Sequence, residues 1–203
     1  LIFIIALFMN LPSSVYIKYC YSSTFWILTL VTFFEVALFF YILNRLGAIM
    51  TGIDPSRNNI EVAKLHAKEM SLNVNYSHCS PENFKSEKKF SVILAMEVVE
   101  HVSNVNLFIE NCSKLLEKNG IMFVATINKN LKSYIFSILG AEYILRWLPI
   151  GTHDWDKFLT PQDLKIIASR NNFQSDEMVG MKFNLFSKEW TKSNDTSVNY
   201  IST

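Results

Sequence analysis

The spacing of apolar and polar residues predicts strands that alternate with helices over most of the chain. Short apolar runs of strand length occupy residues 49–53, 90–95 and 121–126, and Val74 to Ser77 is expected to form a further short strand. Between them, segments with one apolar and one charged face extend from Asn58 to Met70 and from Asn104 to Leu116. This alternation predicts an α/β fold with a doubly wound sheet, which binds ligands at the carboxyl ends of its strands.

The C-terminal part continues the pattern with one helix and two strands. Thr160-Pro161-Gln162-Asp163 has the composition of an N-cap followed by proline at the first helical position, so we expect a helix to about Arg170. Residues 178–183 and 197–201 are expected to form the last, antiparallel strands. Asn119-Gly120 predicts a turn between the helix that ends near Leu116 and the strand at 121–126.

The first 45 residues have a different, strongly apolar character. Leu1 to Met9 is wholly apolar and has the composition of part of a signal-like region. Phe25 to Leu43 is interrupted only by Glu35 and two threonines, and it is long enough for a transmembrane helix. A glutamate at mid-span is costly in lipid, which argues against that reading.

Composition and charge narrow the function classes. A chain of 203 residues suffices for one domain with a sizeable core. The net charge of +1 gives no electrostatic footprint for nucleic acid, so no nucleic-acid partner is expected. The three cysteines lack the paired spacing of a zinc site or a disulfide framework, which makes a reducing, intracellular setting the expectation.

An acidic cluster follows the apolar run at residues 90–95. Glu97, Glu100 and His101 are spaced i, i+3 and i+4, so a helix that began here would carry all three side chains on one face. Two carboxylates and an imidazole at the end of a strand could hold one divalent cation. The same spacing also occurs on solvated helices, where acidic residues in the first turn simply complement the helix dipole.

Residues 131–150 form the other informative stretch. Apolar and aromatic residues predominate there, and the basic residues Lys129, Lys132 and Arg146 flank or interrupt them. This composition suits a helix that lies in a membrane interface, and it equally suits a buried core helix. His153 and Asp154 follow directly; they could line a substrate pocket or be an ordinary solvated pair.

Several stretches, in order, resemble the ubiquinone-biosynthesis O-methyltransferases. They are Gly52-Ile53-Asp54-Pro55, Met96 to Val102, Ala125 to Lys129, Gly140 to Leu145 and Gly151 to Trp155. The likeness extends from about Leu46 to Tyr200, so residues 46–203 are expected to form a Rossmann-like methyltransferase domain, with residues 131–150 as a membrane-facing insertion over the active site. The resemblance implies transfer of a methyl group from S-adenosylmethionine to catechol-type hydroxyls of polyprenylated quinone precursors.

The resemblance also implies site residues and partners. It assigns Asp54 to the cofactor ribose and Met96 to cofactor contact, although an aspartate before Pro55-Ser56 is also a common turn or helix cap and a lone methionine is more often core. It favours a divalent cation, with Mg²⁺ expected, on Glu97, Glu100 and His101. The expected partners are the polyprenylated phenol or catechol, the membrane lipid surface and other quinone-biosynthesis enzymes. The expected location is peripheral on the inner membrane, on the bacterial cytoplasmic or mitochondrial matrix side.

The glycine-rich loop of the family is absent from this sequence. The family has a glycine-rich loop after its first strand, and two of the expected glycines fall on Val36 and Ala37. One hypothesis is a reading-frame disturbance across residues 1–45 that erased strand and loop; the alternative is a genuine membrane anchor at residues 25–43. The alternative function is then an inactive or membrane-tethered methyltransferase remnant without cofactor binding, and a third reading is a methyltransferase for another small hydroxylated aromatic.

Overall fold

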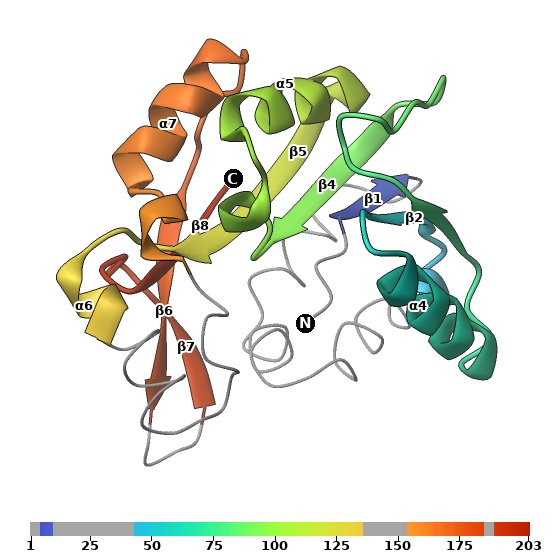
Figure 1. The fold of residues 1–203 in the computed structure, drawn as a ribbon, viewed down its shortest axis with the longest axis horizontal. Helices are drawn as coiled ribbons and strands as arrows, with labels where there is room; N and C mark the ends of the chain where they lie inside the picture. Colours follow the sequence, from blue (N-terminus) through green and yellow to red (C-terminus); the bar gives the residue numbers. More distant parts are fainter. Residues whose placement is uncertain (1–4, 10–42, 136–153, 185–188) are drawn as a thin grey trace.

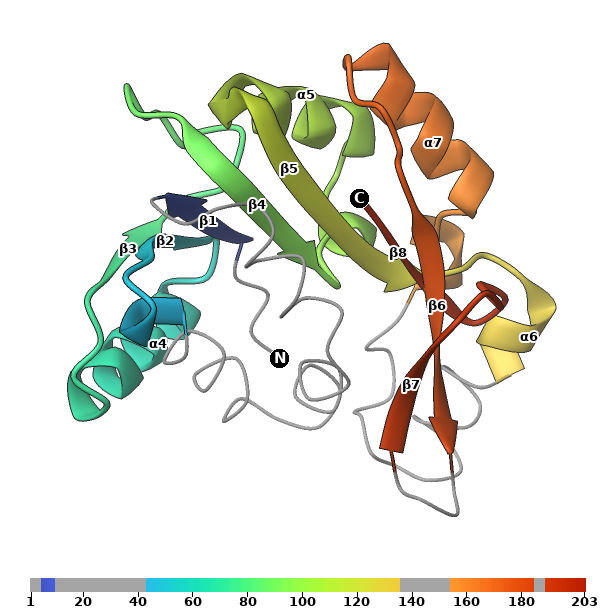
Figure 2. The ribbon, with the colours of Figure 1, turned by 180° about the vertical axis from the view of Figure 1, so that it is seen from behind.

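The computed structural model describes residues 5–9, 43–135, 154–184 and 189–203, which build one mixed sheet with helices on both faces. The strand order is β3-β2-β1-β4-β5-β8-β6-β7 (Figures 1 and 2). The expected doubly wound α/β arrangement is therefore confirmed for these residues. The predicted transmembrane segment at residues 25–43 and most of the insertion at 131–150 lie outside the described part.

The parallel half of the sheet has four strands. They are β3 (Val74–His78), β2 (Ile49–Asp54), β4 (Phe90–Met96) and β5 (Leu116–Ile127). β2 pairs in parallel with β3, and β4 pairs in parallel with β5. Along β4, Val92 and Leu94 pack into one apolar cluster while Ile93 and Ala95 pack into the other, on the opposite face. Burial on both faces explains why this strand is a continuous apolar run and does not alternate.

β1 (Ile5–Met9) occupies the centre of the sheet and runs antiparallel to both of its neighbours. Ile5 pairs with Ile53 and Met9 pairs with Ile49, so β1 begins at the edge where β2 ends. Residues 5–9 of the apolar stretch Leu1 to Met9 thus form a strand in the structure, and the signal-like region expected there stays a prediction. An apolar run of this length is compatible with a central strand and with a leader segment, so the sequence pattern alone does not distinguish these two structures.

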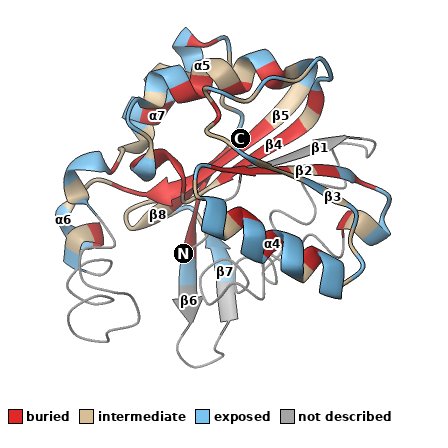
Figure 3. Cartoon of the chain, turned by 45° about the vertical axis from the view of Figure 1, so that its right-hand side comes forward, coloured by how far each residue is buried: buried red, intermediate tan, exposed pale blue. Residues whose placement is uncertain are grey.

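Helices cover the two faces of the sheet unequally. α5 (Val105–Leu115) and α7 (Pro161–Arg170) lie on one face, and α4 (Arg57–Glu69) lies on the other (Figure 3). Each helix begins with a side-chain cap: Ser56, Asn104 and Thr160 accept hydrogen bonds from the first-turn amides, and of these caps only Thr160 was predicted. α5 and α7 bury Phe108, Ile109, Cys112 and Leu164 against the sheet.

The C-terminal strands form the antiparallel half. They are β6 (Met178–Asn184), β7 (Glu189–Ser193) and β8 (Asn199–Ser202), with β8 between β5 and β6. β6 and β8 were expected, whereas β7 was not, because its residues Glu189 to Ser193 are mostly polar. It forms an edge strand whose only strand partner in the described residues is β6.

The predicted turn at Asn119-Gly120 is wrong. α5 ends at Leu115, and β5 continues through Gly120 to Ile127. A Cβ at Gly120 would lie 3.1 Å from the carbonyl oxygen of Phe90 and 2.7 Å from a methyl group of Leu116. The glycine is therefore present because strands β4 and β5 approach closely where their register shifts, and not because the chain turns.

Candidate functional site

The candidate site lies at the edge of the sheet where β2, β4 and β5 end. These strands run in the same direction, because β2 and β4 are both antiparallel to β1 and β4 is parallel to β5. Asp54, Met96 and Ile127 are their last residues. The predicted cofactor residues Asp54 and Met96 therefore share one edge, where a doubly wound sheet binds its ligand.

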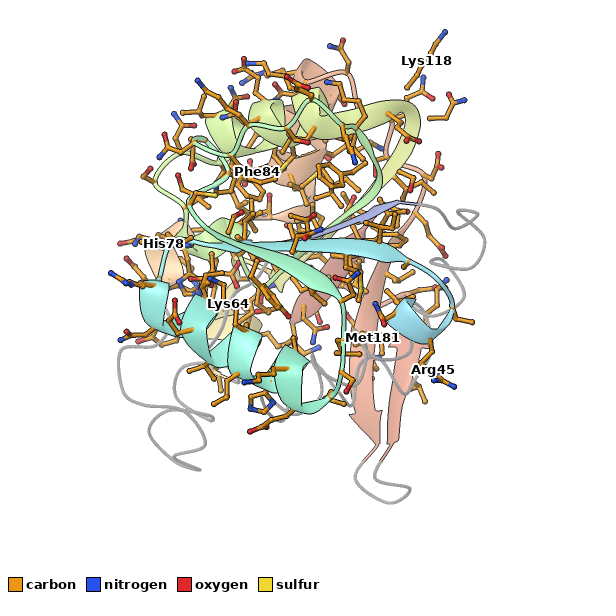
Figure 4. All side chains as sticks on the ribbon, turned by 90° about the vertical axis from the view of Figure 1, so that its right-hand side faces the viewer. Arg45, Lys64, His78, Phe84, Lys118 and Met181 are labelled. Atoms are coloured by element: carbon orange, nitrogen blue, oxygen red, sulfur yellow. The ribbon has the colours of Figure 1, made fainter. Side chains whose placement is uncertain are left out.

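Asp54 is almost fully buried, and its carboxylate organises the start of α4. Oδ1 accepts a hydrogen bond from the Ser56 amide at 2.6 Å, and the Asn59 side-chain amide donates to both oxygens at 3.2 Å. His78, labelled in Figure 4 at the end of β3, contacts the Pro55 carbonyl through Nε2 at 2.9 Å. The turn reading of Asp54 is confirmed, whereas the cap of the helix is Ser56. Oδ1 already accepts two hydrogen bonds and Oδ2 accepts one, so a lone pair of Oδ2 is left for a ribose hydroxyl.

Met96 is half-buried at the end of β4 and packs against the cluster that contains Val92 and Leu94. The next residue, Glu97, donates its amide to the Ala125 carbonyl at 2.9 Å and has a φ of 52°. This left-handed conformation is uncommon for a residue with a side chain and costs about 1–2 kcal/mol. It turns the chain out of the strand immediately beyond Met96.

The expected helical face of Glu97, Glu100 and His101 is not formed. Glu97 precedes a single 3₁₀ turn, η1 (Val99–His101), so the three residues do not follow α-helical spacing. Glu100 is buried with 3% exposure, whereas His101 is exposed. The turn is held in place by Val98 and Val99, which are buried in the apolar cluster under α5 and α7. Their burial selects the tight turn over a longer amphipathic helix.

Glu97 and Glu100 nevertheless lie together. The pKa of Glu97 is raised well above its usual value by burial, by the negative charge of Glu100 and by a hydrogen bond with the Glu100 side chain. The neighbouring Tyr200 is also buried, and burial together with these two carboxylates and Asp163 raises its pKa. Its hydroxyl donates to the Leu159 carbonyl at 3.1 Å. The edge is therefore acidic and poorly solvated.

One oxygen of the carboxylate pair lacks a hydrogen-bond donor, which is a feature that a bound cation would explain. Thr126 Oγ1 donates to Glu100 Oε2 at 2.8 Å, while Glu100 Oε1 is buried and receives no hydrogen bond from an amide or a hydroxyl; the carboxyl of Glu97 is the neighbouring group that can share a proton with Glu100. An unpaired buried carboxylate oxygen beside a second carboxyl is what a divalent cation or a shared proton would neutralise. Over the described ranges, no three histidine, cysteine, aspartate or glutamate side chains are close enough to hold a metal ion.

The loop after β5 makes several long-range contacts that the sequence did not predict. Asn128 and Asn130 donate their side-chain amides to the carbonyls of Thr196 and Ser197, at 2.8 and 2.5 Å. Lys129 Nζ lies 5.1 Å from the ring centre of Trp155 and donates to the Asp156 carbonyl at 2.7 Å. These contacts connect the end of β5 to residues 196–197 and to residues 155–156. The only signal for them in the sequence is the number of asparagine, lysine and tryptophan residues in these segments.

Trp155 also receives the edge of the Tyr134 ring, with ring centres 6.3 Å apart and planes at 90°. Asp154 caps the short 3₁₀ helix η3 (Trp155–Lys157) through the Asp156 amide and pairs with Lys157 at 3.9 Å. His153 lies outside the described residues. The substrate-pocket role of His153 and Asp154 stays a prediction, as do the loop positions Val36 and Ala37.

Known structures identify the class of this fold. A magnesium protoporphyrin IX methyltransferase from Synechocystis PCC 6803 with bound SAH superposes with a TM-score of 0.57, at 15% identity, over 80% of this chain and 66% of that one. A Pyrococcus horikoshii protein, PH0226, superposes with a TM-score of 0.58, at 14% identity, over 81% of this chain and 74% of that one. The described part of the chain has the class I methyltransferase fold.

The chain belongs to the methyltransferase-domain family, whose model matches residues 36–177. Within the family it is 59% identical over 157 residues to the ubiquinone biosynthesis O-methyltransferase of Pelagibacter ubique, a match that covers 77% of this chain and 65% of that protein. The corresponding Bartonella tribocorum enzyme is 48% identical over 158 residues, covering 77% and 64% of the two chains. The resemblance expected from the sequence is confirmed, and the chain spans slightly less than two thirds of these relatives.

Proposed function

We propose that the chain is an S-adenosylmethionine-dependent O-methyltransferase that methylates catechol-type hydroxyls of polyprenylated ubiquinone precursors. The 59% identity to a ubiquinone biosynthesis O-methyltransferase carries this proposal. The convergence of Asp54, Met96 and the Glu97–Glu100 pair on one edge supports it, because the cofactor and the acceptor hydroxyl must meet there for direct transfer.

Asp54 and Met96 are the proposed cofactor contacts. Asp54 is pre-positioned by Ser56 and Asn59, so its carboxylate can accept ribose hydroxyls without reorganising. Met96 offers an apolar, polarisable side chain at the end of β4, on the same edge of the sheet. When bound, S-adenosylmethionine supplies the methyl group on its sulfonium, and the chain's residues have to hold acceptor and donor in line.

Glu97 and Glu100 are the proposed carboxylate ligands of a divalent cation, Mg²⁺. His101 is the proposed third ligand; it is exposed and lies apart from the pair in this structure, so it would have to turn towards them on binding. When bound, such an ion would lower the pKa of the acceptor hydroxyl and orient it. The unpartnered Glu100 Oε1 supports this assignment. With the ion in this role, the reaction needs no separate side-chain base.

The cofactor and cation proposals are tested on the full chain with Glu97→Gln. We expect calorimetry to give an unchanged S-adenosylmethionine affinity, while metal-dependent turnover is abolished. Glu61→Gln, an exposed glutamate on α4, is the matched control and should keep full activity. An unchanged turnover in Glu97→Gln would contradict the cation proposal.

A substrate with a polyprenyl tail resides in the bilayer, so we propose that residues 131–150 contact a lipid surface. Leu131 and Ile135 are 72% and 47% exposed, next to Lys129 and Lys132. Exposed apolar side chains beside basic ones suit the interface of an anionic membrane. None of the helices in the described part of the chain is long and apolar enough to cross a membrane.

Co-sedimentation with anionic phospholipid vesicles tests the lipid contact. Leu131→Ser combined with Ile135→Ser should reduce the bound fraction several-fold, because apolar burial contributes about 25 cal/mol per Å². Leu65→Ser on α4, where Leu65 is 56% exposed, is the matched control. Equal losses in both variants would contradict a specific lipid-facing surface.

The remnant without cofactor binding is the second candidate, and the direction of β1 favours it. β1 begins at the ligand edge and ends with Met9 opposite Ile49, at the other edge of the sheet and away from Asp54. Calorimetry with S-adenosylmethionine separates the candidates: micromolar binding supports the enzyme, and absent binding supports the remnant. A requirement for a long isoprenoid tail in turnover separates the quinone precursor from another small hydroxylated aromatic.

A further inference from the structure

Thr126 differs chemically from the residues around it at the end of β5. It is fully buried, and its neighbours Ala125 and Ile127 are apolar, as the rest of the strand from Ile121 is. Its hydroxyl donates its hydrogen bond to a distant side chain and not to a neighbouring backbone carbonyl. It donates to Glu100 Oε2 at 2.8 Å, across 26 positions of sequence.

Because of this contact, the two oxygens of the Glu100 carboxylate differ in their hydrogen bonding. Oε2 is fixed by Thr126, and Oε1 is buried with no hydrogen-bond partner. A single donor on one oxygen restricts rotation of the carboxylate, so the position of the other oxygen is also fixed. Leaving a buried carboxylate oxygen unpaired costs free energy, which a ligand at that oxygen would recover.

The backbone keeps Thr126 in register with this turn. The Glu97 amide donates to the carbonyl of Ala125, and Thr126 is paired with Tyr200 of β8 on its other side. Thr126 is therefore held by strands on both sides while the turn that carries Glu100 folds over it. A residue so fixed is suited to orient a ligand-binding side chain.

We propose that Thr126 is a positioning residue that aims Glu100 Oε1 at the divalent cation shared with Glu97. This inference rests on the cation site of the proposed function and extends it by one residue beyond the ligands. Outer partners that orient metal-ligating carboxylates typically change metal affinity by 10–100-fold when they are removed. The hydroxyl, and not the shape of the side chain, is the required feature.

The test is calorimetric titration of the full chain with Mn²⁺ and Mg²⁺, without cofactor or substrate. Thr126→Val, which keeps the shape and removes the hydroxyl, should weaken cation binding about 10-fold or more. Thr126→Ser, which keeps the hydroxyl, should bind within about threefold of the wild type. Thr51→Val on β2 is the matched control, because it makes the same chemical change away from Glu100.

S-adenosylmethionine affinity is measured in parallel and should be the same in all variants, since Thr126 acts through Glu100. If Thr126→Val does not fold, as judged by circular dichroism, Thr126→Cys carries the same comparison with a weaker donor of similar size. Wild-type cation affinity in Thr126→Val would overturn the inference, and so would equal losses in Thr126→Ser and Thr126→Val. Absence of cation binding in the wild type would overturn the cation site as well, which distinguishes the two failures.

Discussion

The amide of Glu97 donates to the carbonyl of Ala125 at 2.9 Å, which extends the β4–β5 ladder one residue beyond Met96. The same residue has a left-handed backbone with a φ of 52°. One residue thus both completes the sheet and turns the chain towards Glu100. The position of the acidic pair is consequently fixed by backbone hydrogen bonding and does not depend on a helix.

Glu97→Gln is expected to stabilise the cation-free protein at neutral and alkaline pH. The folded-state pKa of Glu97 is raised above the unfolded value, mainly by burial and then by Glu100, so the ionised form is disfavoured in the fold. The stability associated with this group is present below the unfolded pKa of about 4.3 and is lost as pH rises through the folded pKa.

Thermal unfolding with a chelator present measures this effect. The melting temperature of Glu97→Gln should exceed that of the wild type at pH 8, and the difference should shrink towards pH 4. Each 1 kcal/mol recovered corresponds to about 2–4 °C. A melting-temperature difference that is the same at both pH values would contradict the assignment.

Asp54→Ala should destabilise the fold by about 1–3 kcal/mol. The substitution leaves the Ser56 amide and the Asn59 side chain without their buried acceptor. Asp54→Asn keeps one carbonyl oxygen and should lose less stability. Urea unfolding measures both, and S-adenosylmethionine affinity should fall in both variants; a fall only in the less stable variant would indicate a purely structural role.

Gly180→Ala should be more destabilising than Gly120→Ala. A Cβ at Gly180 would lie 1.9 Å from the backbone oxygen of Asp195, so the backbone itself must move, at a cost of about 1–3 kcal/mol. At Gly120 the closest atom is a Leu116 methyl group, which can rotate away. Equilibrium urea unfolding compares the two, and the reverse order would refute this account of how β6 packs against the segment between β7 and β8.

Lys129 and Trp155 should be energetically coupled. With Nζ 5.1 Å from the ring centre, a double-mutant cycle of Lys129→Met and Trp155→Leu is expected to give about 0.5–1 kcal/mol of coupling in unfolding free energy. Tyr134→Phe keeps the edge contact on Trp155 and serves as the control, with no measurable change. A coupling energy of zero would show that the loop after β5 is held by its hydrogen bonds alone.

Local signals in the sequence predicted the helices well. The cap at Thr160, the helix that starts near Asn104 and the apolar run of β4 have physical causes that act within a few residues, so the sequence alone predicts them. The features that the sequence did not predict depend on contacts with residues far along the chain. The direction of β1, the polar edge strand β7 and the straight course of β5 through Gly120 are all decided by pairing with distant strands.

The site was predicted in composition but not in geometry. Asp54 and Met96 lie at strand ends as expected, and their cofactor roles remain predictions. Glu97 and Glu100 come together by way of a left-handed residue and a 3₁₀ turn, which the i, i+3 spacing did not predict. Thr126 was missed because an isolated threonine in a strand is ordinary, and only its distant contact with Glu100 gives it significance.

The central position of β1 has a kinetic consequence. Ala6 pairs with Leu94 and Ile5 pairs with Ile53, so the middle of the sheet closes only after segments far apart in the chain have met. Such non-local contacts slow folding, because loop-closure entropy is lost before the pairing is gained. Until then the facing edges of β2 and β4 are unpaired and prone to self-association. The refolding yield of this chain should therefore fall steeply with protein concentration.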